Sequence, residues 1–300
     1  MLCKKPITTP LNLIVGCGQC LGCRVNKRRL WTHRIMLELS LHENSTFATL
    51  TYSDEKLPED HSLKPHDVRD WLKRLRSTYE NETQKKIRYY LVGEYGDKTQ
   101  RPHYHVILFG YPNCLYGLSQ YSKQQTTCCP PCEEIKRSWG KGNIFLGQVT
   151  KASSQYVCGY VVKKMTAKTD PRLNGRYPEF ARMSLKPGIG ADYMKKLLDI
   201  ITSEHGVKIL ERLQDVPQSI MYDGKEYPLG KYLRKKLREL YGMSETNATP
   251  ETIEAFRQKC KLLWQEAKNK GLKWLIEEKY QTKQASLEKR LEIYQKEKKL

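Results

Sequence analysis

The stretch RPHYHVILFG, residues 101 to 110, decides the fold because it places two histidines inside an apolar run. Side chains alternate between the two faces of a strand, so His103 and His105 point the same way, together with Ile107 and Phe109. The intervening residues are also apolar or aromatic, which predicts a strand in the middle of a sheet covered on both sides. Two neighbouring imidazoles there favour a divalent metal, but a bare His-x-His also occurs as ordinary polar residues near a strand end.

Sequence patterns on either side of this stretch predict its partners in a sheet. STFATLTYSDE (45–55) and IRYYLVGEYG (87–96) are rich in β-branched and aromatic residues, which is typical of strands. The second of these runs into the turn DKTQR (97–101) and returns antiparallel as the histidine strand. NIFLGQVT (143–150) is expected to add a further short strand.

Two segments carry helical signals. PHDVRDWLKRLRSTY (65–79) spaces its apolar residues at i, i+3, i+4 and i+7, namely Val68, Trp71, Leu72 and Leu75. SSQYVCGYVVKKMTAK (153–168) is the second predicted helix, with Ser153 or Ser154 as its N-cap. The order strand, helix, hairpin, strand, helix predicts an α+β fold with a central, mainly antiparallel sheet and flanking helices.

We expect three regions along the chain. Residues 1–44 form a cysteine-rich, basic N-terminal segment, and residues 45–200 form the core, with an irregular cysteine-rich insertion at 111–142. Residues 201–300 form a mainly helical C-terminal region. In it, Pro250 behind Thr249 marks a helix start, and Gly271 marks the end of that helix.

The charge balance points to a polyanionic partner. The 300 residues include 53 Lys and Arg against 33 Asp and Glu, for a formal net charge of +20. Nucleic acid is the first expectation and an anionic membrane surface the second. The 19 tyrosines suit base stacking as well as phosphate contact. No run of 18 apolar residues occurs, and the polar segment before Cys17 does not fit a signal peptide, so we expect neither membrane insertion nor export.

The second predicted helix gathers groups suited to chemistry on a phosphate. Tyr156, Tyr160, Lys163 and Lys164 share one helical face. A phenol can attack phosphorus and hold the product as a phosphotyrosine ester, provided that cations or a metal activate it at neutral pH. The alternative interpretation is two half-buried tyrosines beside solvated lysines.

A carboxylate lies within reach of the histidines. The hairpin returns Glu94 toward His103 and His105, so that one oxygen and two nitrogen ligands suit Mg²⁺ or Mn²⁺, with Zn²⁺ as an alternative. Such a metal would polarise the scissile phosphate. Asp97 in the turn is the rival third ligand, and an ordinary surface role for Glu94 stays open.

Three motifs, in this order and spacing, resemble those of HUH endonucleases that initiate rolling-circle replication. They are FATLTY (47–52), GEYG (93–96) with RPHYHVILFG (101–110), and YVCGYVVKK (156–164). The paired tyrosines, CGQCLGCR (17–24) and FARMSLKPGIG (180–190) look like the replication initiators of small single-stranded DNA phages, the microviruses of the gokushovirus type. The likeness covers roughly residues 16 to 195.

The resemblance implies a tyrosine helix beside a sheet that carries the His-x-His pair. It also implies a nick in single-stranded origin DNA, a 5′-phosphotyrosine link, a free 3′-OH for a host polymerase and final rejoining of the circle. By position, Tyr156 and Tyr160 are the nucleophiles, His103 and His105 the metal ligands, and Lys163 the family lysine. Lys164 and Glu94 are less securely matched, being a neighbour of Lys163 and a further ligand, respectively.

The cysteines and a basic run pose separate questions. A structural zinc held by thiolates is one reading of two Cys-x2-Cys knuckles, and free thiols are the other; the ligands come from Cys17, Cys20, Cys23, Cys128, Cys129 and Cys132. An iron–sulfur cluster fits less well because the fourth ligand of the usual run is missing. The run CRVNKRRLWTHRI (23–35) offers either a DNA-backbone contact or a solvated helix face through Arg24, Lys27, Arg28 and Arg29.

We therefore expect a metal-dependent, tyrosine-nucleophile DNA endonuclease and strand transferase of a phage, active in the cytoplasm of the bacterial host. A P-loop motif is absent from the sequence, so strand unwinding falls to a host helicase. The rival within the class is a plasmid relaxase or a single-strand transposase. The rival outside it is a non-catalytic, zinc-stabilised nucleic-acid-binding protein, which has no use for two tyrosines on one face.

Overall fold

The chain folds into two compact units. One comprises Arg28–Leu197 and Tyr227–Leu229 and is called the sheet unit; the other comprises Met1–Lys27, Leu198–Glu226 and Gly230–Leu300 and is called the terminal unit. The computed structural model describes residues 3, 5–10, 13–96, 98–116, 128–159, 170–222, 224–243 and 248–270. Among the helices in these ranges, none combines the length and the apolar composition needed to cross a bilayer.

A five-stranded antiparallel sheet is the centre of the sheet unit. Its strands run in the order β6-β3-β5-β4-β7, with the bounds β3 (Ser45–Thr51), β4 (Arg88–Tyr95), β5 (Pro102–Phe109), β6 (Ile144–Gln148) and β7 (Phe180–Met183). The histidine strand β5 thus lies in the middle, paired along its length with β3 and β4. The predicted central position of this strand and the α+β fold class are confirmed.

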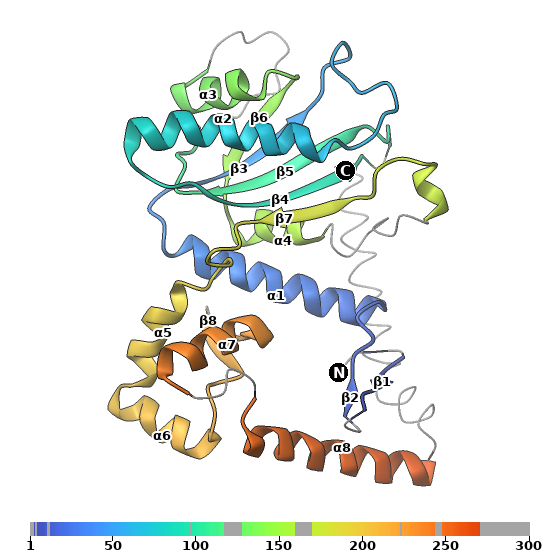
Figure 1. The fold of residues 1–300 in the computed structure, drawn as a ribbon, viewed down its shortest axis with the longest axis vertical. Helices are drawn as coiled ribbons and strands as arrows, with labels where there is room; N and C mark the ends of the chain where they lie inside the picture. The colour runs from blue at the N-terminus through green and yellow to red at the C-terminus, as the bar shows by residue number, and fades with distance from the viewer. Residues whose placement is uncertain are drawn as a thin grey trace. The chain divides into compact units, whose positions relative to one another are not determined.

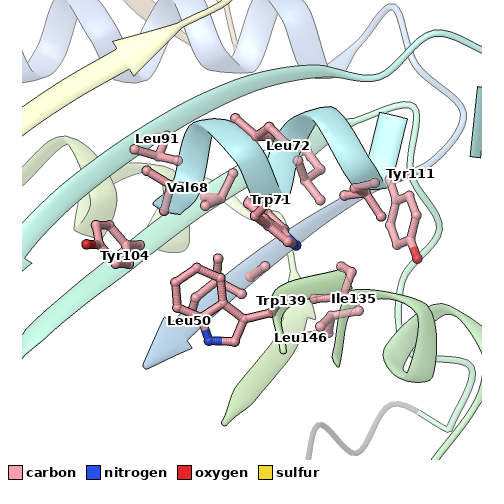
Figure 2. Close-up of a cluster of buried hydrophobic side chains, with 14 of the residues drawn as sticks. Leu50, Val68, Trp71, Leu72, Leu91, Tyr104, Tyr111, Ile135, Trp139 and Leu146 are labelled. Carbon is pink, nitrogen blue, oxygen red and sulfur yellow. The ribbon is translucent and has the colours of Figure 1, made fainter. Parts of the chain in front are cut away.

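Helices cover both faces of the sheet (Figure 1). On one face lie α2 (Pro65–Thr83) and α3 (Pro130–Trp139), and on the other lie α4 (Lys151–Gly159) and the sheet-unit part of α1 (Leu21–Leu39). The face under α2 and α3 has the larger core, with Trp71, Trp139 and Tyr104 packed together (Figure 2). Each large side chain removed from water there stabilises the fold by about 1.5–3 kcal/mol, so this face supplies much of the packing energy.

The alternation within β5 divides the core between the faces. Tyr104, Val106 and Leu108 join the core under α2 and α3, whereas Ile107 and Phe109 join the core under α1 and α4. All five side chains are fully buried. A strand with apolar residues on both faces therefore occupies the one place where both faces are covered.

Two details of the prediction are wrong. The segment 111–142 is not irregular throughout, because it contains α3; the two prolines occupy its first turn, where an N–H has no helical partner to lose. The tyrosine helix starts at Lys151, not after a serine cap. The Oγ1 of Thr150 accepts a hydrogen bond from the backbone N–H of Ser153 at 3.1 Å, so Thr150 is the capping residue.

The remaining elements are mostly helical. They are η1 (Pro171–Leu173), α5 (Tyr193–Ile201), α6 (Glu204–Leu213), α7 (Gly230–Tyr241) and α8 (Pro250–Lys270), with the short strands β1 (Ile7–Thr8), β2 (Ile14–Val15), β8 (Ser219–Tyr222) and β9 (Lys225–Pro228). In the terminal unit, buried Asp215 joins α7 to α8, because it accepts from Arg238 at 2.7 Å and from Thr252 at 2.9 Å. The predicted helix start at Pro250 is confirmed, and Gly271 lies outside the described residues.

Candidate active site

Three neighbouring strands place polar side chains on one face of the sheet. Glu94 of β4 lies directly opposite His103 of β5. On the other side of β5, Thr49 of β3 lies opposite His105. Opposed residues of antiparallel strands share a face, so all four side chains project to the side that α4 covers. The hairpin register therefore returns Glu94 to the histidines, as its position in the sequence predicts.

Both ring nitrogens of His105 have partners. Its Nε2 lies 2.9 Å from Oε1 of Glu94, and its Nδ1 lies 3.0 Å from Oγ1 of Thr49. His105 and Glu94 are buried, with 4% and 7% of their surfaces exposed. An ionised carboxylate can only accept, so the proton of this contact belongs to Nε2. These partners hold the imidazole in one orientation.

His103 is held through its other nitrogen. Its Nδ1 donates to the backbone carbonyl of Arg101 at 2.7 Å, since a carbonyl oxygen can only accept. This tautomer leaves the lone pair on Nε2, the arrangement that metal-binding histidines use. Burial lowers the pKa of His103 below its ordinary value of 6.5, against a smaller opposite effect of the Arg101 carbonyl. The ring is therefore neutral at pH 7 and available as a ligand.

Tyr156 on α4 lies against this cluster. Its ring centroid is 5.4 Å from that of His105, at 79° between the planes, and 6.4 Å from that of Phe47, at 83°. The next two residues, Val157 and Cys158, are fully buried and fix the helix on the sheet. Tyr156 itself keeps 37% of its surface exposed. Its phenol is thus both positioned by aromatic contacts and open to a large substrate.

Four of the predicted site residues lie outside the described residues. They are the second tyrosine, both lysines and the rival ligand in the turn: Tyr160, Lys163, Lys164 and Asp97. Their roles stay predictions.

The four basic residues predicted to contact DNA fall in different places. In the sheet unit, Arg28 Nε donates to the carbonyl of Gln155 at 3.0 Å, which puts a guanidinium on the helix of Tyr156. Arg29, in the same unit, lies 5.4 Å from the ring centroid of Tyr227. In the terminal unit, Arg24 donates to the carbonyl of Gln19 at 2.7 Å, and Lys27 is exposed. Of the four, Arg28 is the one that these contacts bring to the tyrosine helix.

The donor set fits a divalent cation in type. Glu94 Oε1 and His105 Nε2 are 2.9 Å apart, close to the separation of about 3 Å between adjacent ligands in an octahedral shell with bonds of about 2.1 Å. A cation bound there would replace the proton between them. However, Glu94, His103 and His105 are not among the groups of described residues whose ligand atoms all lie within 4.8 Å of one another. Completing the set of three therefore requires a side-chain shift.

The cysteines form two clusters, each complete in itself. Cys3, Cys17, Cys20 and Cys23 make up cluster A in the terminal unit, and Cys114, Cys128, Cys129 and Cys132 make up cluster B in the sheet unit. Within each cluster all four sulfur atoms lie within 4.8 Å of one another, so each could hold a metal ion. A single site shared by the two Cys-x2-Cys knuckles is therefore wrong.

Sequence reasoning missed three residues of these sites. Thr49, the partner of His105, stands in the FATLTY motif, and strand pairing with β5 is the signal that would have found it. Cys3 and Cys114 each stand fourteen residues before the next cysteine of their cluster, Cys17 and Cys128. That repeated spacing is a signal for a fourth ligand.

Comparison with known proteins places this geometry in a context. Residues 45–165, which include the histidine pair and the tyrosine helix, match the family model of the replication-associated protein ORF2. Replication-associated protein ORF2 of Spiroplasma virus 4 is 35% identical over 66% of this chain and 62% of its own length. Replication-associated protein VP4 of Bdellovibrio phage phiMH2K is 33% identical over 60% of this chain and 57% of its own length.

A third relative, replication-associated protein ORF4 of Chlamydia phage 1, is 26% identical over 75% of this chain and 53% of its own length. The chain thus spans less than two thirds of the length of each of these relatives. No solved structure matches it significantly. Through its core at residues 45–165, the chain belongs with the phage replication-associated proteins of the ORF2 family.

Proposed function

We propose that this protein initiates rolling-circle replication of a phage genome by nicking single-stranded origin DNA with a tyrosine. Its relatives carry the name of replication-associated proteins, and the family match covers the histidine pair and both tyrosines. The observation that carries the nuclease proposal is the contact of the Tyr156 ring with His105, whose Nε2 is hydrogen-bonded to Glu94. A nucleophile and a set of metal-type ligands are thus side by side.

The proposed reaction is a transesterification. The Oη of Tyr156 attacks the phosphorus and loses its proton, while the bond from phosphorus to the 3′ oxygen breaks and that oxygen takes up a proton. The products are a 5′-phosphotyrosine link and a free 3′-OH. Because one phosphoester replaces another, the link can later be attacked by a 3′-OH to close the replicated circle. Tyr160 is the proposed second nucleophile for that closing exchange.

The surrounding residues have separate tasks. Glu94, His103 and His105 would hold Mg²⁺ or Mn²⁺, which supplies Lewis-acid polarisation of the phosphate. Thr49 keeps the His105 ring in place through its 3.0 Å hydrogen bond. The guanidinium of Arg28 adds positive charge beside the tyrosine helix, where it favours a phenolate and a phosphate. Lys163 and Lys164 are proposed to neutralise the phosphate.

The proposal also implies partners. The net charge of +20 suits a DNA backbone. A host polymerase would extend the 3′-OH, and a host helicase would open the duplex, since the sequence has no P-loop motif. These reactions would take place in the cytoplasm of the bacterial host.

Cleavage of end-labelled circular single-stranded phage DNA tests the proposal. The full chain is incubated with Mn²⁺ or Mg²⁺, and a covalent protein–DNA adduct is sought on a denaturing gel. We expect an adduct with the wild type, none after chelation, and none with the double variant Tyr156→Phe, Tyr160→Phe. The two single variants show which tyrosine cuts.

Tyr177→Phe is a matched control, because Tyr177 is an exposed tyrosine of the same unit (41%) and it should leave the adduct unchanged. DNA binding without any adduct, on several origin sequences, would contradict the nuclease and indicate a non-catalytic binding protein. An adduct that forms on plasmid-transfer or transposon-end sequences and not on phage origins would instead indicate a relaxase or transposase.

A further inference from the structure

Eight of the ten cysteines are left unused by the proposed nuclease. All ten are free thiols in the structure, so clusters A and B contain no disulfide. Each cluster nevertheless gathers four sulfurs within 4.8 Å, in a sequence where the members are up to twenty residues apart. Four unbridged thiols brought to one point twice in one chain call for a common explanation.

The sulfur separations match a tetrahedral metal site. In cluster B, Cys129 Sγ lies 3.8 Å from that of Cys114 and 3.5 Å from that of Cys132, and the Cys114 and Cys128 sulfurs are 3.8 Å apart. In cluster A, the Cys20 and Cys3 sulfurs are 3.8 Å apart. A Zn²⁺ ion with four bonds of about 2.3 Å spaces its sulfurs about 3.8 Å apart. A disulfide would require about 2.05 Å.

Backbone N–H groups point at the sulfurs in both clusters. The amide of Cys17 donates to Cys3 Sγ at 3.2 Å, and that of Cys20 donates to Cys17 Sγ at 3.4 Å. In cluster B, the amide of Leu115 donates to Cys129 Sγ at 3.3 Å. Such donors favour sulfur in the thiolate form, which is the form that binds metals.

The two clusters follow one plan. Each joins a cysteine from an upstream segment to cysteines at the start of a helix: Cys20 and Cys23 flank the start of α1, and Cys129 and Cys132 lie at the start of α3. The upstream member is Cys3, which the β1–β2 hairpin returns to Cys17, or Cys114, which follows β5. The plan is a cross-link between the first turn of a helix and the segment that precedes it.

We propose that each cluster is a separate structural zinc site with four thiolate ligands, so that the folded chain binds two Zn²⁺ ions. Cluster A fastens the β1–β2 hairpin to α1. Cluster B fastens α3 to the end of β5, and its buried members Cys129 and Cys132 belong to the core that includes Trp139. A polynuclear iron–sulfur cluster, which spreads its ligand sulfurs around several iron atoms, does not fit separations of a single-ion tetrahedron.

Metal content of the purified full-length chain, measured by mass spectrometry after desalting, tests the proposal. We expect two zinc ions per chain in the wild type, one in Cys3→Ser, one in Cys114→Ser and none in the double variant. Cys260→Ser and Cys158→Ser are the matched controls, because these buried cysteines lie outside both clusters, and each should keep two zinc ions.

Two replacements guard against variants that simply misfold. Cys3→His and Cys114→His keep a zinc ligand at the same position, so they should retain two ions where serine loses one. The wild type itself is also decisive. One zinc ion per chain, no zinc, iron in its place, or two ions that survive both serine substitutions would each overturn the two-site proposal, whatever the outcome of the DNA cleavage test.

Discussion

Two buried carboxylates occupy opposite ends of the same face of the sheet and have opposite kinds of partners. Glu38 on α1, 1% exposed, contacts Arg88 at the start of β4, and Glu94, 7% exposed, lies near the end of that strand. Arg88 and Glu94 are six residues apart in one strand, so both project toward the side of α1 and α4.

The partners set the difference between them. Glu38 accepts from the guanidinium of Arg88, from the amide of Gly190 at 2.7 Å and from His42 at 3.2 Å. Burial alone would raise the pKa of Glu38, but these hydrogen bonds outweigh it and lower the pKa. Glu94 instead faces His105, an imidazole that is a cation only when protonated. A permanent cation makes a buried carboxylate structural, whereas neutral imidazoles leave one suited to a metal.

The largest effect is expected from Glu94→Gln. It keeps the size of the side chain and removes its charge, so adduct formation should fall about 10²- to 10³-fold, equivalent to roughly 3–4 kcal/mol of transition-state stabilisation. The rate of adduct formation at fixed Mn²⁺ measures it. Glu38→Gln is the matched control and should form adduct normally per folded molecule. Equal losses in both variants would erase the proposed distinction.

Stability should respond in the opposite sense. Glu38→Gln leaves Arg88 half-buried without its counter-charge, so the free energy of unfolding should fall by about 3 kcal/mol, whereas Glu94→Gln should change it by less than about 1 kcal/mol. Urea denaturation followed by tryptophan fluorescence reports this, since Trp71 and Trp139 are buried in the sheet unit. A larger loss for Glu94→Gln would make that residue the structural one.

A smaller effect is expected at Thr49. Thr49→Val removes the hydroxyl that fixes His105 Nδ1, and loss of such a partner typically weakens metal binding about 10- to 100-fold. The Mn²⁺ concentration for half-maximal adduct formation should rise by that factor, while Thr49→Ser, which keeps the hydroxyl, should stay near the wild type. An unchanged Mn²⁺ requirement in Thr49→Val would show that the hydrogen bond does not support the metal site.

The smallest effect concerns pH. Since the folded-state pKa of Glu38 lies below its ordinary value of 4.5, its stabilisation is fully present above about pH 4.5 and is lost as the pH falls through the folded value. The wild type should lose about 1.4 kcal/mol for each unit by which the pKa is lowered. The stability difference between wild type and Glu38→Gln should therefore shrink in acid, and a constant difference would contradict the ionic account.

The sheet and its central strand could be predicted because they depend on local periodicity. Alternation in β5 fixes which residues share a face, and the hairpin turn fixes the register that sets Glu94 opposite His103. The helix α2 was predictable from Val68, Trp71 and its later apolar positions for the same reason, and these residues are buried.

What could not be predicted depends on chain segments that meet only in the folded molecule. Arg28 reaches the tyrosine helix because α1 lies on the same face of the sheet, and no spacing in the sequence encodes that contact. Cys114 joins cysteines fourteen or more residues away because β5 and α3 pack side by side with the core. The edge strand β7 is short and largely exposed, so it lacks the apolar alternation that identifies a strand.

The position of β5 between two hydrogen-bonded neighbours restricts how this gene can change in length. Deleting or inserting one residue within Pro102–Phe109 would exchange the two sides of everything beyond that point, moving aromatic bulk to the catalytic side or an imidazole into the tryptophan-lined core. No slippage at a free edge can absorb the change, because β3 and β4 pair with β5 along its whole length. We therefore expect insertions and deletions in viable variants of this phage protein to fall outside these three strands.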